Sequence, residues 1–212
     1  MSPRMLVAGI GNVFLGDDAF GVEVAQRLAA TPMPDGVEVL DVGIRGVHLA
    51  YQLLDGYDEL LLVDAISRGD APGTVTVVEP TVEGLEPEPL DPHRLEPGPL
   101  LASVQALGAM PPRVVLVGCE PADLDEGMGL SPVVRNALGP AVDVVRRLID
   151  EFVQRRNVER GSRHDEEEVA AAPGADPDRV GPVSPTRRHR ALPAHQADVN
   201  VALPPPEPAR RS

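Results

Sequence analysis

With 212 residues, 42% hydrophobic and only five aromatic, the chain has enough apolar side chains for one domain with a mainly aliphatic core. Its net charge of −14 at pH 7 argues against nucleic-acid binding, because acidic surfaces repel phosphate backbones. Cys119 is the single cysteine, which excludes an intramolecular disulfide, and we see no membrane-spanning stretch or signal peptide, so we expect a cytoplasmic protein.

Strand-like and helix-like segments alternate over the first 150 residues, a pattern typical of α/β domains. The segment at 59–64 is apolar between its two terminal acids, as expected of a strand with both sheet faces covered. In chain order we predict a strand at 5–10, a helix at 19–29, a strand at 37–42, a short helix ending at residue 53 and a strand at 59–64.

The second half continues with a strand at 73–78, expected beside the strand at 59–64, a strand at 114–118 and a helix at 132–153. Residues 79–99 form a loop rich in Pro and Glu, and so long a loop in a compact domain is usually functional or mobile. We therefore predict a single α/β domain at 1–157, with a twisted, mostly parallel sheet and helices on both faces. Residues 158–212 contain nine prolines and no aromatic residue, so we expect a disordered tail.

Two adjacent acids, Asp17 and Asp18, follow the first predicted strand within GIGNVFLGDDAFG at 9–21. One of them could cap the next helix, but a cap needs only one carboxylate. The loop is not a dinucleotide-binding fingerprint, because Phe14 stands where the third glycine would be required. A functional role for one of the acids therefore stays open.

Two further polar residues are expected near this loop, because ligands of doubly wound sheets bind beyond the carboxyl ends of the strands. Asp64 ends a buried strand, where a carboxylate is costly unless it caps a turn, binds a metal or is used chemically. His93 lies in the Pro- and Glu-rich loop, and alone it would be an ordinary solvated histidine. Together Asp18, Asp64 and His93 make a plausible metal site that binds a free ion weakly but completes the coordination of an ion carried by a substrate.

Covalent catalysis has few candidates in this sequence. There is no nucleophile elbow and no zinc-binding helix motif, Lys is absent, and Cys119 falls in a predicted core strand. Ser67 and Ser103 have no convincing base beside them. If the protein is a hydrolase, we expect an activated water to be the nucleophile.

At these residues the chain resembles the maturation proteases of nickel–iron hydrogenases, which are aspartic-type endopeptidases. The matching segments run across nearly the whole predicted domain: GIGNVFLGDDAFG at 9–21, LDVGIRG at 40–46, LLLVDAIS at 60–67, APGTV at 71–75, PH at 92–93 and VVLVGCEP at 114–121. The resemblance implies that Asp18, Asp64 and His93 contact nickel. It also implies that Asp41 and Gly43 line a neighbouring substrate-recognition surface. For catalysis our hypothesis is that Asp18 or Asp64 holds a water as general base, since two nearby carboxylates split their pKa values.

The resemblance further implies the substrate: a hydrogenase large-subunit precursor that already carries nickel and loses a short C-terminal peptide after a basic residue. Nickel would thus be supplied by the substrate, with no cofactor intrinsic to the protein. Two other functions stay open: a non-catalytic, nickel-checking accessory or chaperone protein on the same fold, and a metallohydrolase that holds its own ion. We expect a monomer that binds neither nucleic acid nor membranes.

Overall fold

The computed structural model describes residues 3–80 and 96–170, and side chains as far as residue 158. One sheet has the strand order β2–β1–β3–β5–β4. The pairs β1/β2, β1/β3 and β3/β5 are parallel, and β4 runs antiparallel to β5 at one edge, which confirms the predicted mostly parallel sheet. The strands are β1 (Met5–Ile10), β2 (Val37–Gly43), β3 (Glu59–Ala65), β4 (Val75–Val78) and β5 (Arg113–Cys119).

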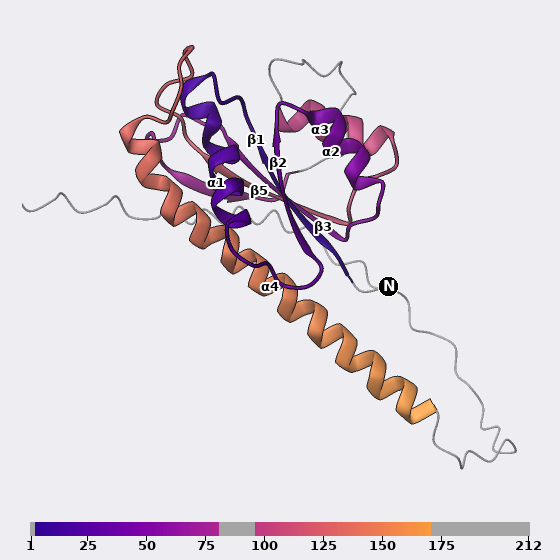
Figure 1. The fold of residues 1–212 in the computed structure, drawn as a ribbon. Coiled ribbons are helices and arrows are strands. Elements are labelled where there is room, and N and C mark those ends of the chain that lie inside the picture. The colour runs from indigo at the N-terminus through magenta and orange to yellow at the C-terminus, as the bar shows by residue number, and fades with distance from the viewer. Residues whose placement is uncertain (1–2, 81–95, 171–212) are drawn as a thin grey trace, which may run out of the picture.

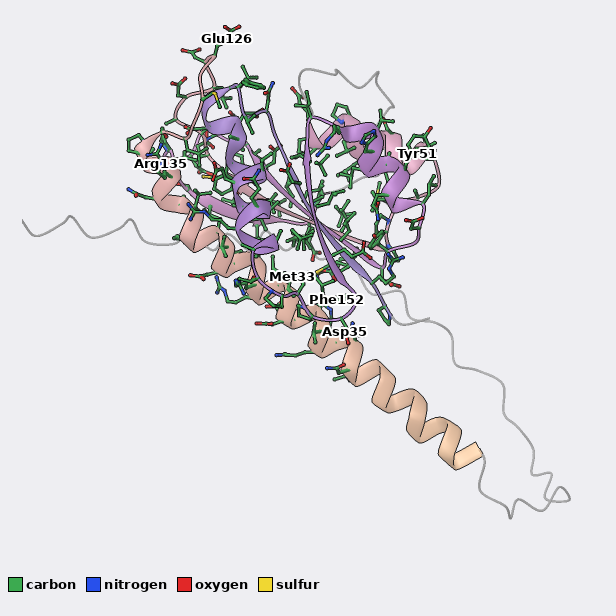
Figure 2. The ribbon with its side chains drawn as sticks, in the orientation of Figure 1. Met33, Asp35, Tyr51, Glu126, Arg135 and Phe152 are labelled. Carbon is green, nitrogen blue, oxygen red and sulfur yellow. The ribbon has the colours of Figure 1, made fainter. Side chains whose placement is uncertain are left out.

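Helices cover both faces of this sheet, as predicted (Figure 1). A 3-10 helix, η1 (Gly16–Ala19), leads into α1 (Phe20–Ala29), which lies with α4 (Pro132–Ala170) on one face; α2 (Gly46–Leu53) and α3 (Pro97–Ala106) lie on the other. Successive residues of β1 enter opposite layers, which is why all six are buried. Phe152 of α4 belongs to the apolar cluster of this layer, and Met33 packs against the same cluster (Figure 2).

Two glycines bring α1 into backbone contact with the sheet. A Cβ on Gly9 of β1 would lie 2.6 Å from the Cβ of Ala25, and a Cβ on Gly21 of α1 would collide with the carbonyl oxygens of Val63 and Ile10. Only glycine permits so close an approach. The start of α1 and the loop before it are thereby held over the carboxyl ends of β1 and β3.

Three elements differ from the sequence-based expectation. β4 lies beside β5, so the prediction that it would neighbour β3 is wrong. The sequence pattern does not predict α3, whose buried residues are nearly consecutive and give no helical periodicity. α4 continues to Ala170 instead of ending at residue 153, so residues 158–170 are helical although they were assigned to the tail. Residues 171–212 lie outside the described part of the chain, and their disorder stays a prediction.

Although α4 is long, neither it nor any other helix within the described residues is long and apolar enough to cross a lipid bilayer.

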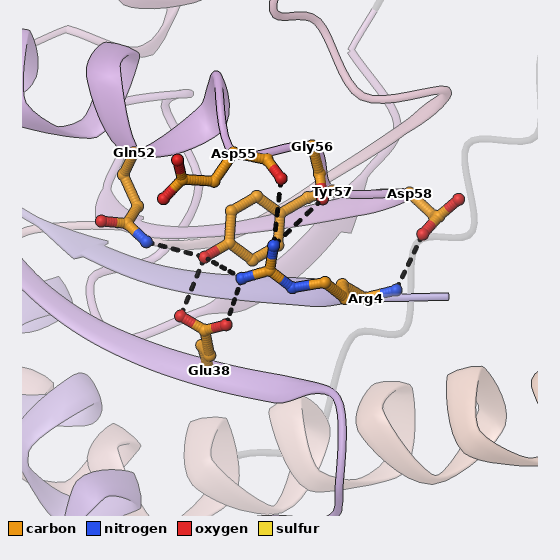
Figure 3. Close-up of polar contacts among 7 residues, drawn as sticks. All are labelled: Arg4, Glu38, Gln52, Asp55, Gly56, Tyr57 and Asp58. Atoms are coloured by element: carbon orange, nitrogen blue, oxygen red, sulfur yellow. Dashed lines mark hydrogen bonds and ion pairs between the residues drawn. The ribbon is translucent and has the colours of Figure 1, made fainter. Parts of the chain in front are cut away.

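A polar cluster around Arg4 ties down the amino-terminal edge of the sheet (Figure 3). The Arg4 guanidinium donates to Glu38 Oε1 (2.5 Å) and to the Tyr57 hydroxyl (3.1 Å), and it lies 4.3 Å from the centroid of the Tyr57 ring. The hydrogen bond from Arg4 lowers the pKa of Glu38. This cluster joins β1, β2 and the turn before β3 at the edge opposite the one where doubly wound folds bind ligands.

Candidate functional site

Asp18 and Asp64 lie at the position where the chain connections diverge. The connection after β1 runs through α1 on one face of the sheet, whereas the connection from β3 to β5 includes α3 on the other face. β1 and β3 are neighbours, so a crevice is expected at their carboxyl ends, where such folds bind ligands. Asp18 follows β1 within η1, and Asp64 is the next-to-last residue of β3.

The carboxyl group of Asp64 is buried, with 3% of the residue exposed. Burial raises its pKa well above the ordinary value, and the negative charges of Asp18 and Glu96 raise it further. A hydrogen bond from the backbone N–H of Ala65 to Asp64 Oδ1 (2.8 Å) acts in the opposite direction. The ionised form of Asp64 is therefore costly, and a cation placed beside it would lower that cost.

Asp18 is half-buried, and its Oδ2 accepts a hydrogen bond from the backbone N–H of Asn12 (2.7 Å). The loop can fold back in this way because Gly11 has a φ of +133°, and a Cβ there would overlap the carbonyl oxygen of Asp18. Since the charge of Asp18 acts on the pKa of Asp64, the two predicted acids share one electrostatic environment.

Neither Asp17 nor Asp18 caps a helix through its side chain, so the capping interpretation is wrong for both. Asp17 is fully buried, and its carboxylate accepts three backbone hydrogen bonds from the loop between β5 and α4. The donors are the N–H groups of Ala122 (2.8 Å), Asp123 (3.0 Å) and Ser131 (2.6 Å). Asp17 thus fixes the loops, while the charge of Asp18 acts on Asp64.

The predicted recognition residues Asp41 and Gly43 lie at the carboxyl end of β2. Asp41 is half-buried, and its Oδ2 accepts a hydrogen bond from Gln26 Nε2 (3.0 Å). Gly43 has a φ of +57°, and its carbonyl oxygen accepts a hydrogen bond from the N–H of Gly11 (3.1 Å). The segment after β2 is therefore joined directly to the loop that carries Asp18.

His93, the third predicted ligand, lies outside the described residues. Within residues 3–80 and 96–158, no three His, Cys, Asp or Glu side chains form a group suited to a metal ion. The described part of the chain thus brings together two of the three predicted ligands.

Two acids that the sequence analysis did not single out also belong to this edge of the sheet. The negative charge of Glu96, at the start of α3, contributes to the raised pKa of Asp64. Glu120 is 9% exposed and accepts hydrogen bonds from the N–H groups of Arg68 (2.7 Å) and Gly69 (3.2 Å), which fixes the segment after Asp64. The run of acidic residues in 79–99 gave no reason to prefer Glu96 over its neighbours.

Two of the nucleophile candidates, Cys119 and Ser103, are poorly suited to covalent catalysis, as predicted. Burial raises the pKa of the Cys119 thiol to about 12, with further contributions from the charges of Asp17 and Glu120, so the reactive thiolate is scarce. The Ser103 hydroxyl donates to the carbonyl oxygen of Pro99 (2.9 Å) within its own helix. Two neighbouring carboxylates, one of them buried, remain as groups that can attract a cation or exchange a proton.

Comparison with known proteins identifies relatives over about two thirds of the chain. The sequence model of the hydrogenase maturation protease family matches residues 22–148, more than half of the chain. The hydrogenase 2 maturation protease of Escherichia coli (strain K12) is 35% identical over 145 residues, which are 67% of this chain and 88% of that protein. The hydrogenase expression/formation protein HupD of Rhizobium leguminosarum bv. viciae is 34% identical over 154 residues, which are 70% of this chain and 75% of HupD.

A solved structure agrees with these relatives. The hydrogenase maturating endopeptidase HybD from E. coli is 33% identical to this chain and superposes with a TM-score of 0.59, covering 70% of this chain and 93% of HybD. Sequence and fold lead to the same assignment. The chain belongs to the hydrogenase maturation protease family.

Proposed function

We propose that this protein is an aspartic-type endopeptidase that recognises nickel in the precursor of a nickel–iron hydrogenase large subunit and removes the C-terminal extension of that subunit. The observation that carries the proposal is the pair Asp18 and Asp64, whose charges interact where β1 and β3 end. The described relatives are named for hydrogenase maturation, which supports the choice of substrate.

In this proposal nickel arrives with the substrate. The carboxylate of Asp64 is disfavoured by burial and by the charge of Asp18, so it gains from the approach of a cation. Two carboxylates and an imidazole bind a free transition-metal ion without much selectivity, but they can complete the coordination of an ion already held elsewhere. Recognition of nickel would then report that the precursor has been loaded.

His93 is proposed as the imidazole ligand. It precedes Glu96 by three residues, a length of chain that spans at most about 11 Å, and the charge of Glu96 reaches Asp64. This covalent connection supports the inclusion of His93 with the two acids.

The proposed reaction is hydrolysis of one peptide bond by water. The substrate's nickel acts as a template for the scissile bond and as a Lewis acid on its carbonyl. Asp18 or Asp64 takes a proton from the water as the water oxygen attacks the carbonyl carbon, and the proton then passes to the departing nitrogen as the C–N bond breaks. The raised pKa of Asp64 makes its carboxylate a stronger proton acceptor than an ordinary carboxylate.

The direct test is the processing of nickel-loaded precursor by the variants Asp64→Ala and His93→Ala. We expect the cleavage rate of Asp64→Ala to fall by about a hundredfold or more, the typical contribution of a general acid–base group. The rate of His93→Ala should also fall, because a proposed nickel ligand is lost. Asp143→Ala is a matched control, because Asp143 is an exposed acid on α4. Cleavage at the normal rate by both variants would contradict the site assignment.

Two alternatives predict different measurements. A nickel-checking chaperone would leave the mass of the precursor unchanged, whereas the proposed endopeptidase shortens it, which mass spectrometry distinguishes. A metallohydrolase with its own ion would be purified with stoichiometric metal, whereas we expect little metal in elemental analysis. We also propose that the protein is a monomer and that it is located in the cytoplasm.

A further inference from the structure

Four large apolar side chains are exposed on two loops beside the paired acids. Val13 and Phe14 belong to the loop after β1, and Leu124 and Met128 belong to the loop between β5 and α4. Phe14 is 63% exposed and Met128 is 79% exposed. We call these four residues, with the acids Asp123, Asp125 and Glu126 of the second loop, the Phe14–Met128 surface.

The two loops are joined through their backbones. The N–H of Gly127 donates to the carbonyl oxygen of Phe14 (2.9 Å), and the N–H of Gly16 donates to the carbonyl oxygen of Gly127 (3.0 Å). The N–H of Asp17 donates to the carbonyl oxygen of Asp123 (2.9 Å), and the buried Asp17 carboxylate accepts three more bonds from the same loop. The surface is therefore held in place before any partner arrives, which lowers the entropic cost of binding.

The charge of this surface restricts what can bind it. Asp123, Asp125 and Glu126 are exposed, with Glu126 at the outward tip of its loop (Figure 2), and residues 11–18 and 119–131 contain no Arg, Lys or His. A second copy of this chain would bring acids against acids, and an anionic membrane would be repelled. A polypeptide segment with apolar side chains and positive charges complements both properties.

We infer that the Phe14–Met128 surface docks an apolar, basic segment of the precursor polypeptide close to the bond that is cut. The inference rests on the proposed function, because it takes the precursor as the occupant. Phe14 precedes Asp18 by four residues in one short loop, so a segment bound here would lie on the loop that carries one of the paired acids. The surface would thus contribute to substrate affinity, and the acids to the chemical step.

Steady-state cleavage of nickel-loaded precursor tests whether the surface contributes to substrate affinity and the acids to the chemical step. The double variant Phe14→Ala/Met128→Ala and the charge variant Asp125→Arg/Glu126→Arg should each raise KM by about tenfold, the loss typical of removing central contacts in an interface, with kcat nearly unchanged. Higher salt should raise the KM of the wild type and have less effect on the charge variant. Tyr51→Ala and Asp143→Arg are matched controls, because Tyr51 is also 63% exposed but lies on α2, and Asp143 lies on α4.

A second measurement separates this inference from the proposed function. In an Asp64→Ala background the precursor is not expected to be cut, so the Kd of the nickel-loaded precursor reports docking alone. A rise in Kd of about tenfold with the surface variants supports docking, even if the wild type fails to cleave and the proposed function fails. Unchanged KM and Kd would overturn the inference, as would a change in oligomeric state of the double variant, which would make a second copy the occupant.

Discussion

Asp17 and Asp18 are adjacent, but their surroundings give them separate roles. Asp17 accepts three backbone hydrogen bonds in a buried position. In the variant Asp17→Asn an NH₂ group replaces one carboxylate oxygen, so a donor would face backbone N–H groups that also donate. We expect a loss of about 2–4 kcal/mol in the free energy of unfolding, since each unsatisfied buried donor costs about 1–3 kcal/mol. Asp18→Asn should change stability much less and impair cleavage. Denaturant unfolding of both variants measures the contrast, and equal stabilities would contradict it.

Asp64 should favour function at the expense of stability at neutral pH. Its pKa is raised in the folded state, so the stability it contributes is present when it is protonated, below its unfolded pKa of about 4, and is lost as pH rises through the raised value. Asp64→Asn removes the cost of the buried charge. The variant should therefore melt above the wild type at about pH 8, and the difference should shrink toward about pH 4.

Thermal unfolding across this pH range tests the prediction for Asp64. Asp143→Asn is the control, because an exposed acid should show little difference at either pH. An Asp64→Asn variant that is less stable than the wild type at the higher pH would mean that the folded protein stabilises the ionised carboxylate.

The site residues differ in how far the sequence could reveal them. Asp18 and Asp64 could be found because Asp18 follows one recognisable strand and Asp64 lies at the end of another, and parallel strands end at one edge of the sheet. The bonds of Asp17 could not, because its donors lie more than 100 residues away and are backbone groups of any residue type. Glu96 gave no signal because its effect on Asp64 depends on how α3 returns to the sheet.

At the scale of elements, the contact between α1 and the sheet makes Gly21 a position where helix propensity and packing conflict. Propensity alone would favour Gly21→Ala by about 1 kcal/mol. A Cβ there would collide with backbone carbonyl oxygens of Val63 and Ile10, which cannot rotate away as a side chain could. We expect a net loss of about 1–3 kcal/mol, the usual range for overpacking, and a displaced α1.

Gly139→Ala in α4 is the matched control for this prediction. A Cβ on Gly139 would meet no atom within 4 Å, and Pro140 after it offsets part of the gain in propensity, so the change should stay within about 1 kcal/mol. Thermal unfolding compares the two variants. A Gly21→Ala variant as stable as the control would mean that α1 can move away from the sheet without loss.

The elements themselves were predictable to different degrees. Strands with buried faces on both sides gave short apolar runs, and β1, β3 and β5 were all found from them. The place of β4 could not be read from its own sequence, because proximity along the chain favoured β3 while the hydrogen-bonding edge available in the sheet was that of β5. α3 was hidden by its prolines and glycine and by its nearly consecutive buried residues.

For the molecule as a whole, α4 decides where the folded domain ends. Phe152 is buried, Arg155 donates to the buried Glu59 carboxylate (2.6 Å), and Arg156 donates to the carbonyl oxygen of Asp35. Beyond these residues Val158 is 70% exposed. Buried contacts of the helix with the described domain are thus present as far along as residue 156, and the helix itself continues to Ala170.

Truncation after residue 157 should therefore leave a folded and active protein. It removes no described buried side chain, and it takes away only −1 of the net charge of −14, so the negative charge that would attract the proposed basic substrate is retained. We expect an unfolding free energy within about 1 kcal/mol of the full chain and unchanged kcat/KM. Truncation after residue 148 is the contrasting control, because it also removes Ile149 and Phe152 and should cost more than about 5 kcal/mol. If the protein truncated after residue 157 were insoluble, residues 158–212 would have to complete the core, and the domain boundary at 157 would be wrong.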